Sequence, residues 1–137
     1  MCFGESLVEM GFGLADLHRV RELVLAAAVD ADLPQERADE LALAVNEIAT
    51  NAIVHGRPPT TLRVWRQKGE IVCEVADAGK GIKDPLAGHL RPPAEAPGGR
   101  GLWLARLLCD AVEIRNGVGC TVTLHATTPV GTPVTAG

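Results

Sequence analysis

One stretch, residues 36–56, constrains the fold more than any other, because it has the pattern of a single amphipathic helix. Acidic residues lie near its start, and Gly56 followed by two prolines lies at its end, as is typical of helix termini. We expect Gly56 to take the left-handed conformation that often ends a helix. Apolar residues recur at steps of three and four, which places them on one face: Leu41, Val45, Ile48, Ala49 and Ala52.

A second, polar stripe runs along the same predicted helix. Glu47, Asn51 and His55 are spaced four residues apart. At about 100° per residue they form a narrow row that borders the apolar face. A carboxylate, an amide and an imidazole in that position would lie at the edge of a pocket. The helix is therefore predicted both to fill the core and to line a site.

Composition limits what the chain can be. With 137 residues, 47% of them apolar, it is long enough for one domain with a real core. We expect a single domain over residues 1–137, with its core at about 14–126. The net charge of -4 and the absence of a basic stripe argue against nucleic acid or an anionic membrane as partner. Aromatic residues, at 3%, offer no stacking platform for single-stranded nucleic acid.

The cysteines and the N-terminal segment indicate the cellular compartment in which the protein is expected. No C-x-x-C pair occurs, so a zinc site is not expected. We find no basic segment followed by an apolar block at the N-terminus, and no apolar run that could span a bilayer. These features predict a cytoplasmic protein with reduced, buried thiols. The four cysteines are scattered: Cys2, Cys73, Cys109 and Cys120.

The order of elements predicts an α+β fold. We expect an antiparallel or mixed, mostly antiparallel sheet with helices stacked on one face, that is, a two-layer α/β sandwich. Asp16 is a candidate cap for the first helix. The predicted elements are a short strand at 6–10, helices at 17–29, 36–56 and 102–109, and strands at 61–67, 70–76, 110–116 and 119–125.

Two segments lack periodicity. Residues 83–98 are rich in proline and long for a loop in a compact domain, so we expect a functional lid or a disordered insert. The tail at 127–137 is rich in Thr, Pro and Gly and is expected to be flexible. Three histidines, His18, His89 and His125, have no evident partners and are expected at the surface.

Asp77, Gly79 and Gly81 follow the predicted strand at 70–76. An aspartate at a strand end can accept a hydrogen bond from an exocyclic amine, such as that of adenine. The two glycines would let the backbone approach a flat base closely. Alone, however, this pattern is more often an ordinary turn.

Gly99, Arg100 and Gly101 open the predicted third helix. The free N–H groups from Gly99 to Leu102 would form an anion site suited to phosphates, and Arg100 adds a positive charge. A Gly-x-Gly before a helix is common and weak by itself. Only the order of the elements, with the helix stripe, the Asp-Gly-Gly turn and the lid preceding this helix, favours a site over chance.

In the polar stripe, Asn51 offers an amide oxygen, a hard ligand suited to Mg²⁺. Glu47, one turn earlier, could accept a proton from an attacking hydroxyl or water. Taken alone, the stripe is more often a plain polar helix edge, and His55 more often a helix-end residue satisfied by local carbonyls.

In this order the motifs resemble the GHKL ATPases, which share the Bergerat ATP-binding fold. Asn51, residues 77–81 and residues 99–102 look like the N, G1 and G2 boxes of that superfamily. Residues 47–56 and 99–105 most resemble the anti-sigma-factor serine/threonine kinases of bacterial partner switching. The resemblance covers about 17–125.

The resemblance implies a role for each position. Glu47 matches the catalytic base, and Asn51 matches the Mg²⁺ ligand, with His55 in the same nucleotide-binding stripe. Asp77 matches the residue that reads the adenine amino group. The other implied nucleotide-binding positions are Gly79 and Gly81 at the base and Gly99, Arg100, Gly101 and Leu102 at the phosphates.

One position departs from the family pattern. The family usually ends with Gly-Thr-x-Val, whose threonine helps to hold the adenine. Here the string is Gly-Cys-Thr-Val, so Cys120 takes the threonine's place. A thiol is a weaker hydrogen-bond partner than a hydroxyl, which bears on ATP affinity.

We therefore expect an ATP- and Mg²⁺-dependent serine/threonine kinase that phosphorylates an anti-sigma antagonist, sequesters a sigma factor, or both, in transcription regulation. The alternative is a non-catalytic, nucleotide-dependent binding module of the same fold. A third reading is a domain that keeps the fold and binds no nucleotide. The family often forms homodimers, and the sequence leaves the oligomeric state open.

Overall fold

The computed structural model describes residues 6–79 and 100–129, and it places the predicted elements in the predicted order. Element boundaries differ from the sequence-based ones by two residues or fewer, apart from an added short 3₁₀ helix, η1. The elements are β1 (Ser6–Gly11), η1 (Leu14–Asp16), α1 (Leu17–Asp30), α2 (Gln35–His55), β2 (Thr61–Gln67), β3 (Glu70–Asp77), α3 (Arg100–Leu108), β4 (Ala111–Asn116) and β5 (Cys120–Thr127).

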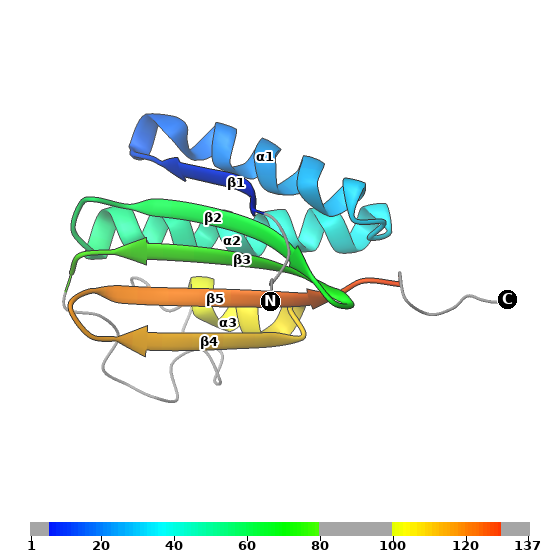
Figure 1. Ribbon diagram of the computed structural model, residues 1–137. Coiled ribbons are helices and arrows are strands. Elements are labelled where there is room, and N and C mark those ends of the chain that lie inside the picture. The colour runs from blue at the N-terminus through cyan, green and yellow to red at the C-terminus, as the bar shows by residue number, and fades with distance from the viewer. Residues whose placement is uncertain (1–5, 80–99, 130–137) are drawn as a thin grey trace, which may run out of the picture.

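The strands form one five-stranded sheet in the order β1-β2-β3-β5-β4. All four pairings between described strands are antiparallel. The three helices cover one face, and α2 contacts both α1 and α3 (Figure 1). The predicted two-layer α+β fold is confirmed, with an antiparallel rather than a mixed sheet.

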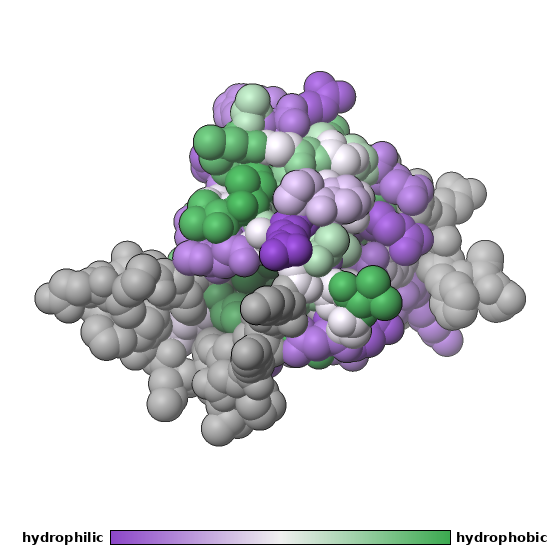
Figure 2. Space-filling model, turned by 90° about the vertical axis from the view of Figure 1, so that its left-hand side faces the viewer, coloured by the Kyte–Doolittle hydropathy of each residue, from purple (hydrophilic) through white to green (hydrophobic). Residues whose placement is uncertain are grey.

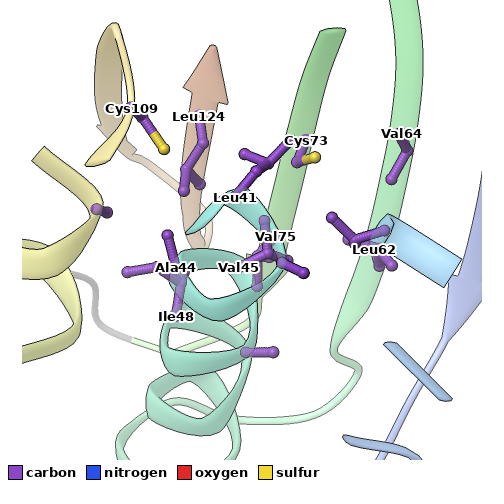
Figure 3. Packing of buried hydrophobic residues seen from close by; sticks show 14 of the residues in the cluster. Leu41, Ala44, Val45, Ile48, Leu62, Val64, Cys73, Val75, Cys109 and Leu124 are labelled. Carbon is purple, nitrogen blue, oxygen red and sulfur yellow. The ribbon is translucent and has the colours of Figure 1, made fainter. Parts of the chain in front are cut away.

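The core lies between α2 and the sheet. Leu41, Val45 and Ile48 of α2 are at most 3% exposed, and they face the sheet near Leu62 and Val75 (Figure 3). Alanines fill most of the remaining buried positions of α2. Small side chains let α1 and α3 pack close to α2 on either side. The predicted apolar face is confirmed.

Two predicted helix ends differ in detail. Gly56 is extended, with φ -95 and ψ -154, and not left-handed. Glycine is required there for space, because a Cβ would lie 2.5 Å from the Asp77 carboxylate carbon. Asp16 does not cap α1 with its side chain. Its carboxylate accepts a hydrogen bond from the Gly13 N–H at 2.9 Å instead, because η1 precedes α1.

The expectation for His125 was wrong. Its side chain is only 17% exposed and lies on β5 between two acids. The Nδ1 atom is 3.2 Å from Glu70 on β3, and Nε2 is 3.2 Å from Glu113 on β4. His18 is exposed as expected, but it also has a partner, Glu22, at 3.1 Å.

Cys73, Cys109 and Cys120 are buried and form no disulfide bond within the described residues. Burial raises the pKa of Cys73 well above its usual range and raises the pKa of Cys109 to about 12. Because the thiolate is the reactive form, both thiols are inert in the folded protein. None of the helices in the described ranges is long and apolar enough to be a candidate for crossing a membrane.

Strand β5 reaches Thr127, and Thr128 is buried, donating its N–H to the Gly69 carbonyl at 2.9 Å. The first residues of the expected tail are therefore part of the fold. Other predicted features lie outside the described residues: the lid at 83–98, the tail from 130, Cys2, Gly81, His89 and Gly99.

Candidate functional site

The ends of four separate elements that carry predicted site residues lie at one end of the molecule. Asp77 is the last residue of β3, and it pairs across the sheet with Cys120, the first residue of β5. Helix α2 ends at His55, and Gly56 follows it directly against Asp77. Helix α3 begins toward this same end (Figure 1).

The Asp77 carboxylate is held by backbone groups from two loops. Its Oδ1 atom accepts a hydrogen bond from the Gly79 N–H at 2.6 Å and a longer one from the Arg57 N–H at 3.4 Å. The Ala78 N–H donates to the Arg57 carbonyl at 2.8 Å. Within the described residues, Oδ2 has no hydrogen-bond donor. Among the described residues, one oxygen is thus used by the fold, and the other has no donor.

Three glycines make room around Asp77. A Cβ on Gly56 would lie 2.5 Å from its carboxylate carbon, and one on Gly79 would lie 2.8 Å from its Oδ1 atom. A Cβ on Gly119 would lie 2.1 Å from the Asp77 carbonyl oxygen. Real Cβ atoms do not approach this closely, so each of the three positions excludes every larger residue without local movement.

Of these glycines, sequence reasoning assigned only Gly79 to the site. Gly56 was predicted for a different reason, and Gly119 was noted only as part of the string before Cys120. The signal that could have found both is positional. Each glycine directly adjoins a predicted site residue, His55 or Cys120, at the end of its element.

Glu47 and Asn51 lie one turn apart on α2 and are both half-buried. Within the described part of the chain, neither side chain forms a hydrogen bond or an ion pair. Their polar neighbours behave differently. The Asn46 amide donates to the Leu17 carbonyl at 2.8 Å, and the Thr50 hydroxyl donates to the Asn46 carbonyl at 2.8 Å.

A carboxylate and an amide that have no partner among the described residues can bind a ligand without first breaking a bond to any of these residues. The carboxylate can accept a proton, and the amide oxygen can bind a hard cation. His55, at the end of the same stripe, is exposed. The stripe therefore borders the buried face, as its spacing predicted.

Helix α3 starts at Arg100, close to the predicted position, so its first turn is where the phosphate site was expected. Leu102 is 5% exposed, which places its side chain in the core and leaves only its backbone for a ligand. The other end of α3 is tied to α2. Arg37 donates to the Leu108 carbonyl at 2.9 Å and pairs with Asp110 at 3.1 Å.

Figure 2 looks onto the end of the molecule that carries Asp77, where apolar and polar side chains are interspersed. Val54, in the last turn of α2, is 62% exposed. Val118, in the turn between β4 and β5, is fully exposed. The surface at this end is thus neither uniformly charged nor uniformly apolar.

Comparison with known proteins decides the family. Residues 12–126 match the model of the histidine kinase-like ATPase domain. The chain belongs to this family. The match spans most of the chain and includes all the predicted motifs, so the resemblance to GHKL ATPases is confirmed.

Two curated relatives of this ATPase domain carry the narrower resemblance. Both are described as anti-sigma F factor, one from Thermoanaerobacter sp. (strain X514) and one from Thermoanaerobacter pseudethanolicus (strain ATCC 33223 / 39E). Each is 28% identical over 120 residues, covering 81% of this chain and 83% of the relative.

Solved structures share the fold at low identity. The blue-light activated histidine kinase of Erythrobacter litoralis EL346 is 22% identical with a TM-score of 0.54; the match covers 82% of this chain but 41% of that kinase. The histidine kinase domain of the E. coli osmosensor EnvZ is 16% identical with a TM-score of 0.53, over 96% of this chain and 94% of that domain.

Proposed function

We propose that this ATPase domain binds ATP at the Asp77 end of the sheet. The observation that carries the proposal is the Asp77 carboxylate. Its Oδ1 atom is held by the Gly79 N–H at 2.6 Å, while Oδ2 is left to accept a hydrogen bond from the adenine amino group. Gly56, Gly79 and Gly119 lie too close to Asp77 for any side chain, so their backbones fix the position of the carboxylate that would read the base.

The phosphates would extend from the base toward α2 and the first turn of α3. Free N–H groups at the start of α3, with Gly99, Arg100 and Gly101, would bind the phosphate oxygens, and Gly81 would help to shape the base pocket. Mg²⁺, when bound, would neutralise the phosphate charge. The described residues hold no cluster of three metal-binding side chains. A single amide, Asn51, fits Mg²⁺, which takes most of its ligands from phosphates and water.

The chemistry we propose is phosphoryl transfer to a serine or threonine hydroxyl of a partner protein. The hydroxyl oxygen attacks the γ-phosphorus, the bond to the β,γ-bridging oxygen breaks, and ADP leaves. Glu47 accepts the hydroxyl proton. Its unpaired, half-buried carboxylate supports this role, since no protein contact within the described residues competes for it.

The partners we propose are an anti-sigma antagonist, as phosphate acceptor, and a sigma factor, in the cytoplasm of a bacterium. The two relatives described as anti-sigma F factor support this choice. A pull-down from native lysate with and without ATP would identify both partners. Recovery of neither protein would contradict the partner-switching role.

Transfer is tested with γ-labelled ATP, a candidate antagonist protein and the variant Glu47→Gln. Loss of a general base slows transfer by roughly 10²- to 10⁴-fold. Glu36→Gln, in the exposed first turn of the same helix, is the matched control and should transfer normally. Equal transfer by both variants would remove Glu47 from the catalytic role.

Binding is tested separately by calorimetry. Asp77→Asn replaces an acceptor with a mixed donor and acceptor and should weaken ATP binding roughly 10- to 100-fold, the size of a hydrogen bond to a charged group. Unchanged ATP affinity would mean that the adenine base does not bind at Asp77.

A non-catalytic binding module remains the second candidate, because Cys120 stands where the family has threonine. Cys120 is 4% exposed and lies directly across from Asp77, so a weaker hydrogen-bonding group lines the proposed base pocket. ATP binding by calorimetry without transfer to any partner would favour this candidate. No thermal shift at millimolar Mg·ATP would favour a domain that binds no nucleotide.

A further inference from the structure

We infer that Arg57 is a further nucleotide-binding residue, whose guanidinium group lies against the purine. The inference rests on the proposed ATP site and adds a residue that none of the predicted motifs contains. It is carried by the position of Arg57 in the backbone, by the state of its side chain and by the residues around Asp77.

The backbone of Arg57 is fixed to the strand end that would read the base. Its N–H lies 3.4 Å from Oδ1 of Asp77, and its carbonyl accepts the Ala78 N–H at 2.8 Å. A Cβ on Gly79 would lie only 3.2 Å from the Arg57 nitrogen. A base bound at Oδ2 of Asp77 is therefore within the reach of an arginine side chain that starts here.

The side chain of Arg57 is exposed. It has no hydrogen bond or ion pair within the described part of the chain. Four other arginines in the described ranges are engaged: Arg37 and Arg106 donate to backbone carbonyls, and Arg63 and Arg115 pair with Glu74. The side chain of Arg66, like that of Arg57, has no such contact within these ranges. Within the described residues, a ligand could therefore bind the guanidinium of Arg57 without the loss of an existing contact.

The residues around Asp77 leave a role for the Arg57 side chain in binding the purine. The residues placed close to Asp77 above are otherwise small: Gly56, Gly79 and Gly119, and its strand partner Cys120. A planar guanidinium covers the face of an aromatic ring and is attracted to it. Arg57 would supply the flat surface that these small residues cannot, and its charge would offset part of the charge of Asp77.

The backbone contacts also indicate which part of the nucleotide Arg57 meets. Both of its hydrogen bonds go to the end of β3, whereas the proposed phosphate site is the first turn of α3. We therefore assign Arg57 to the purine and not to the phosphates. The two assignments predict different dependence on the number of phosphates.

The experiment measures dissociation constants by competition against a fluorescent nucleotide, for wild type, Arg57→Ala and Arg57→Lys. The competitors are ATP, ADP and inorganic tripolyphosphate. Loss of an exposed cation–π contact weakens binding by roughly two- to fivefold. Arg57→Ala should weaken ATP and ADP by the same factor and leave tripolyphosphate unchanged. Arg57→Lys, which keeps the charge but not the plane, should remain weaker than wild type.

Arg66→Ala is the matched control. Arg66 lies near the far end of β2 and pairs with Ile71, away from Asp77, so its loss removes the same charge without touching the site. Equal affinity of Arg57→Ala and wild type, weakened tripolyphosphate binding, or an equal loss in Arg66→Ala would each overturn the assignment. Failure of the proposed function is distinct: there the wild type itself would not bind ATP.

Discussion

Gly56→Ala is the substitution whose effect the structure predicts most directly, because the added methyl group would clash with its neighbours. The added methyl would lie 2.5 Å from the Ala52 carbonyl oxygen, 2.5 Å from the carboxylate carbon of Asp77 and 2.6 Å from its Oδ1 atom. The backbone at Gly56, with φ -95, is open to alanine. Any effect must therefore come from these contacts and not from backbone strain.

The magnitude follows from the movement that the methyl imposes. Carbon atoms pack at about 3.5–4.0 Å, so the carboxylate must retreat by about 1 Å. The hydrogen bond from the Gly79 N–H, now 2.6 Å, would then stretch beyond the bonding range. Overpacking costs about 1–3 kcal/mol, and a lost bond to a carboxylate about 1.5–3 kcal/mol. If both costs apply in full, we expect the free energy of unfolding to fall by about 2.5–6 kcal/mol.

The assay is urea unfolding, read as a change in midpoint at constant slope, together with ATP titration. Because Oδ2 moves with the rest of the carboxylate, ATP affinity should fall by roughly tenfold or more, the value of one hydrogen bond to a charged group. Stability and affinity are expected to fall together, since the displaced carboxylate contributes to both losses, while the contact with the Ala52 carbonyl oxygen adds to the loss of stability.

Two further variants make the result decisive. Gly117→Ala, in the β4–β5 turn, places its methyl where nothing lies within 4 Å and should change stability by less than about 0.5 kcal/mol. Gly56→Asn tests the left-handed alternative, because asparagine tolerates that conformation. We expect it to be at least as harmful as alanine. Equal stability of Gly56→Ala and Gly117→Ala would refute the steric argument.

Three other predictions concern the fold. His125→Ala should lower unfolding free energy by about 1–2 kcal/mol in chemical denaturation, because it leaves Glu70 and Glu113 without their shared partner; His18→Ala, at an exposed pair, should cost less than about 0.5 kcal/mol. Gly69→Ala should lose about 1 kcal/mol in the same assay, since φ is +74 at the turn between β2 and β3. The two thiols whose pKa values are raised by burial, those of Cys73 and Cys109, should react with a thiol reagent at pH 8 only after denaturant is added; rapid labelling of the native protein would contradict their burial.

The sequence was sufficient wherever the physical cause is local. The apolar period along α2 predicted its buried face, and the strands predicted at 61–67 and 70–76 match β2 and β3. Asp77 could be predicted as a site residue because a strand-ending aspartate followed by glycines is recognisable within a few residues. Helix α3 was found from the glycines that precede it.

What the sequence could not supply depends on contacts between distant segments. Gly56 has the local sequence pattern of a left-handed helix end. The structure requires glycine there for another reason, the close approach of Asp77, which comes from a different element. His125 looked unpaired because its two partners, Glu70 and Glu113, come into reach only through the register of three strands. In both cases the residues can be read from the sequence, but the contacts between them cannot.

Helix α2 carries two kinds of polar residue: some hydrogen-bond to the protein, and others have no partner among the described residues. This difference can be tested. Asn46 anchors the helix to the start of α1 through the Leu17 carbonyl, whereas Glu47, the next residue, binds nothing within the described part of the chain. Asn46→Ala should therefore lower unfolding free energy by about 1 kcal/mol. Glu47→Gln should change it by less than about 0.5 kcal/mol while abolishing most transfer.

The same denaturant titrations compare both variants directly, and Thr50→Val serves as a second anchoring position, since its hydroxyl bonds to the Asn46 carbonyl. The buried face of α2 and the hydrogen bond of Asn46 hold the helix in place. The Glu47 carboxylate is therefore not needed to hold the helix and can serve a substrate. If Glu47→Gln proved as destabilising as Asn46→Ala, its carboxylate would be part of the scaffold, and the argument for a free general base on α2 would fail.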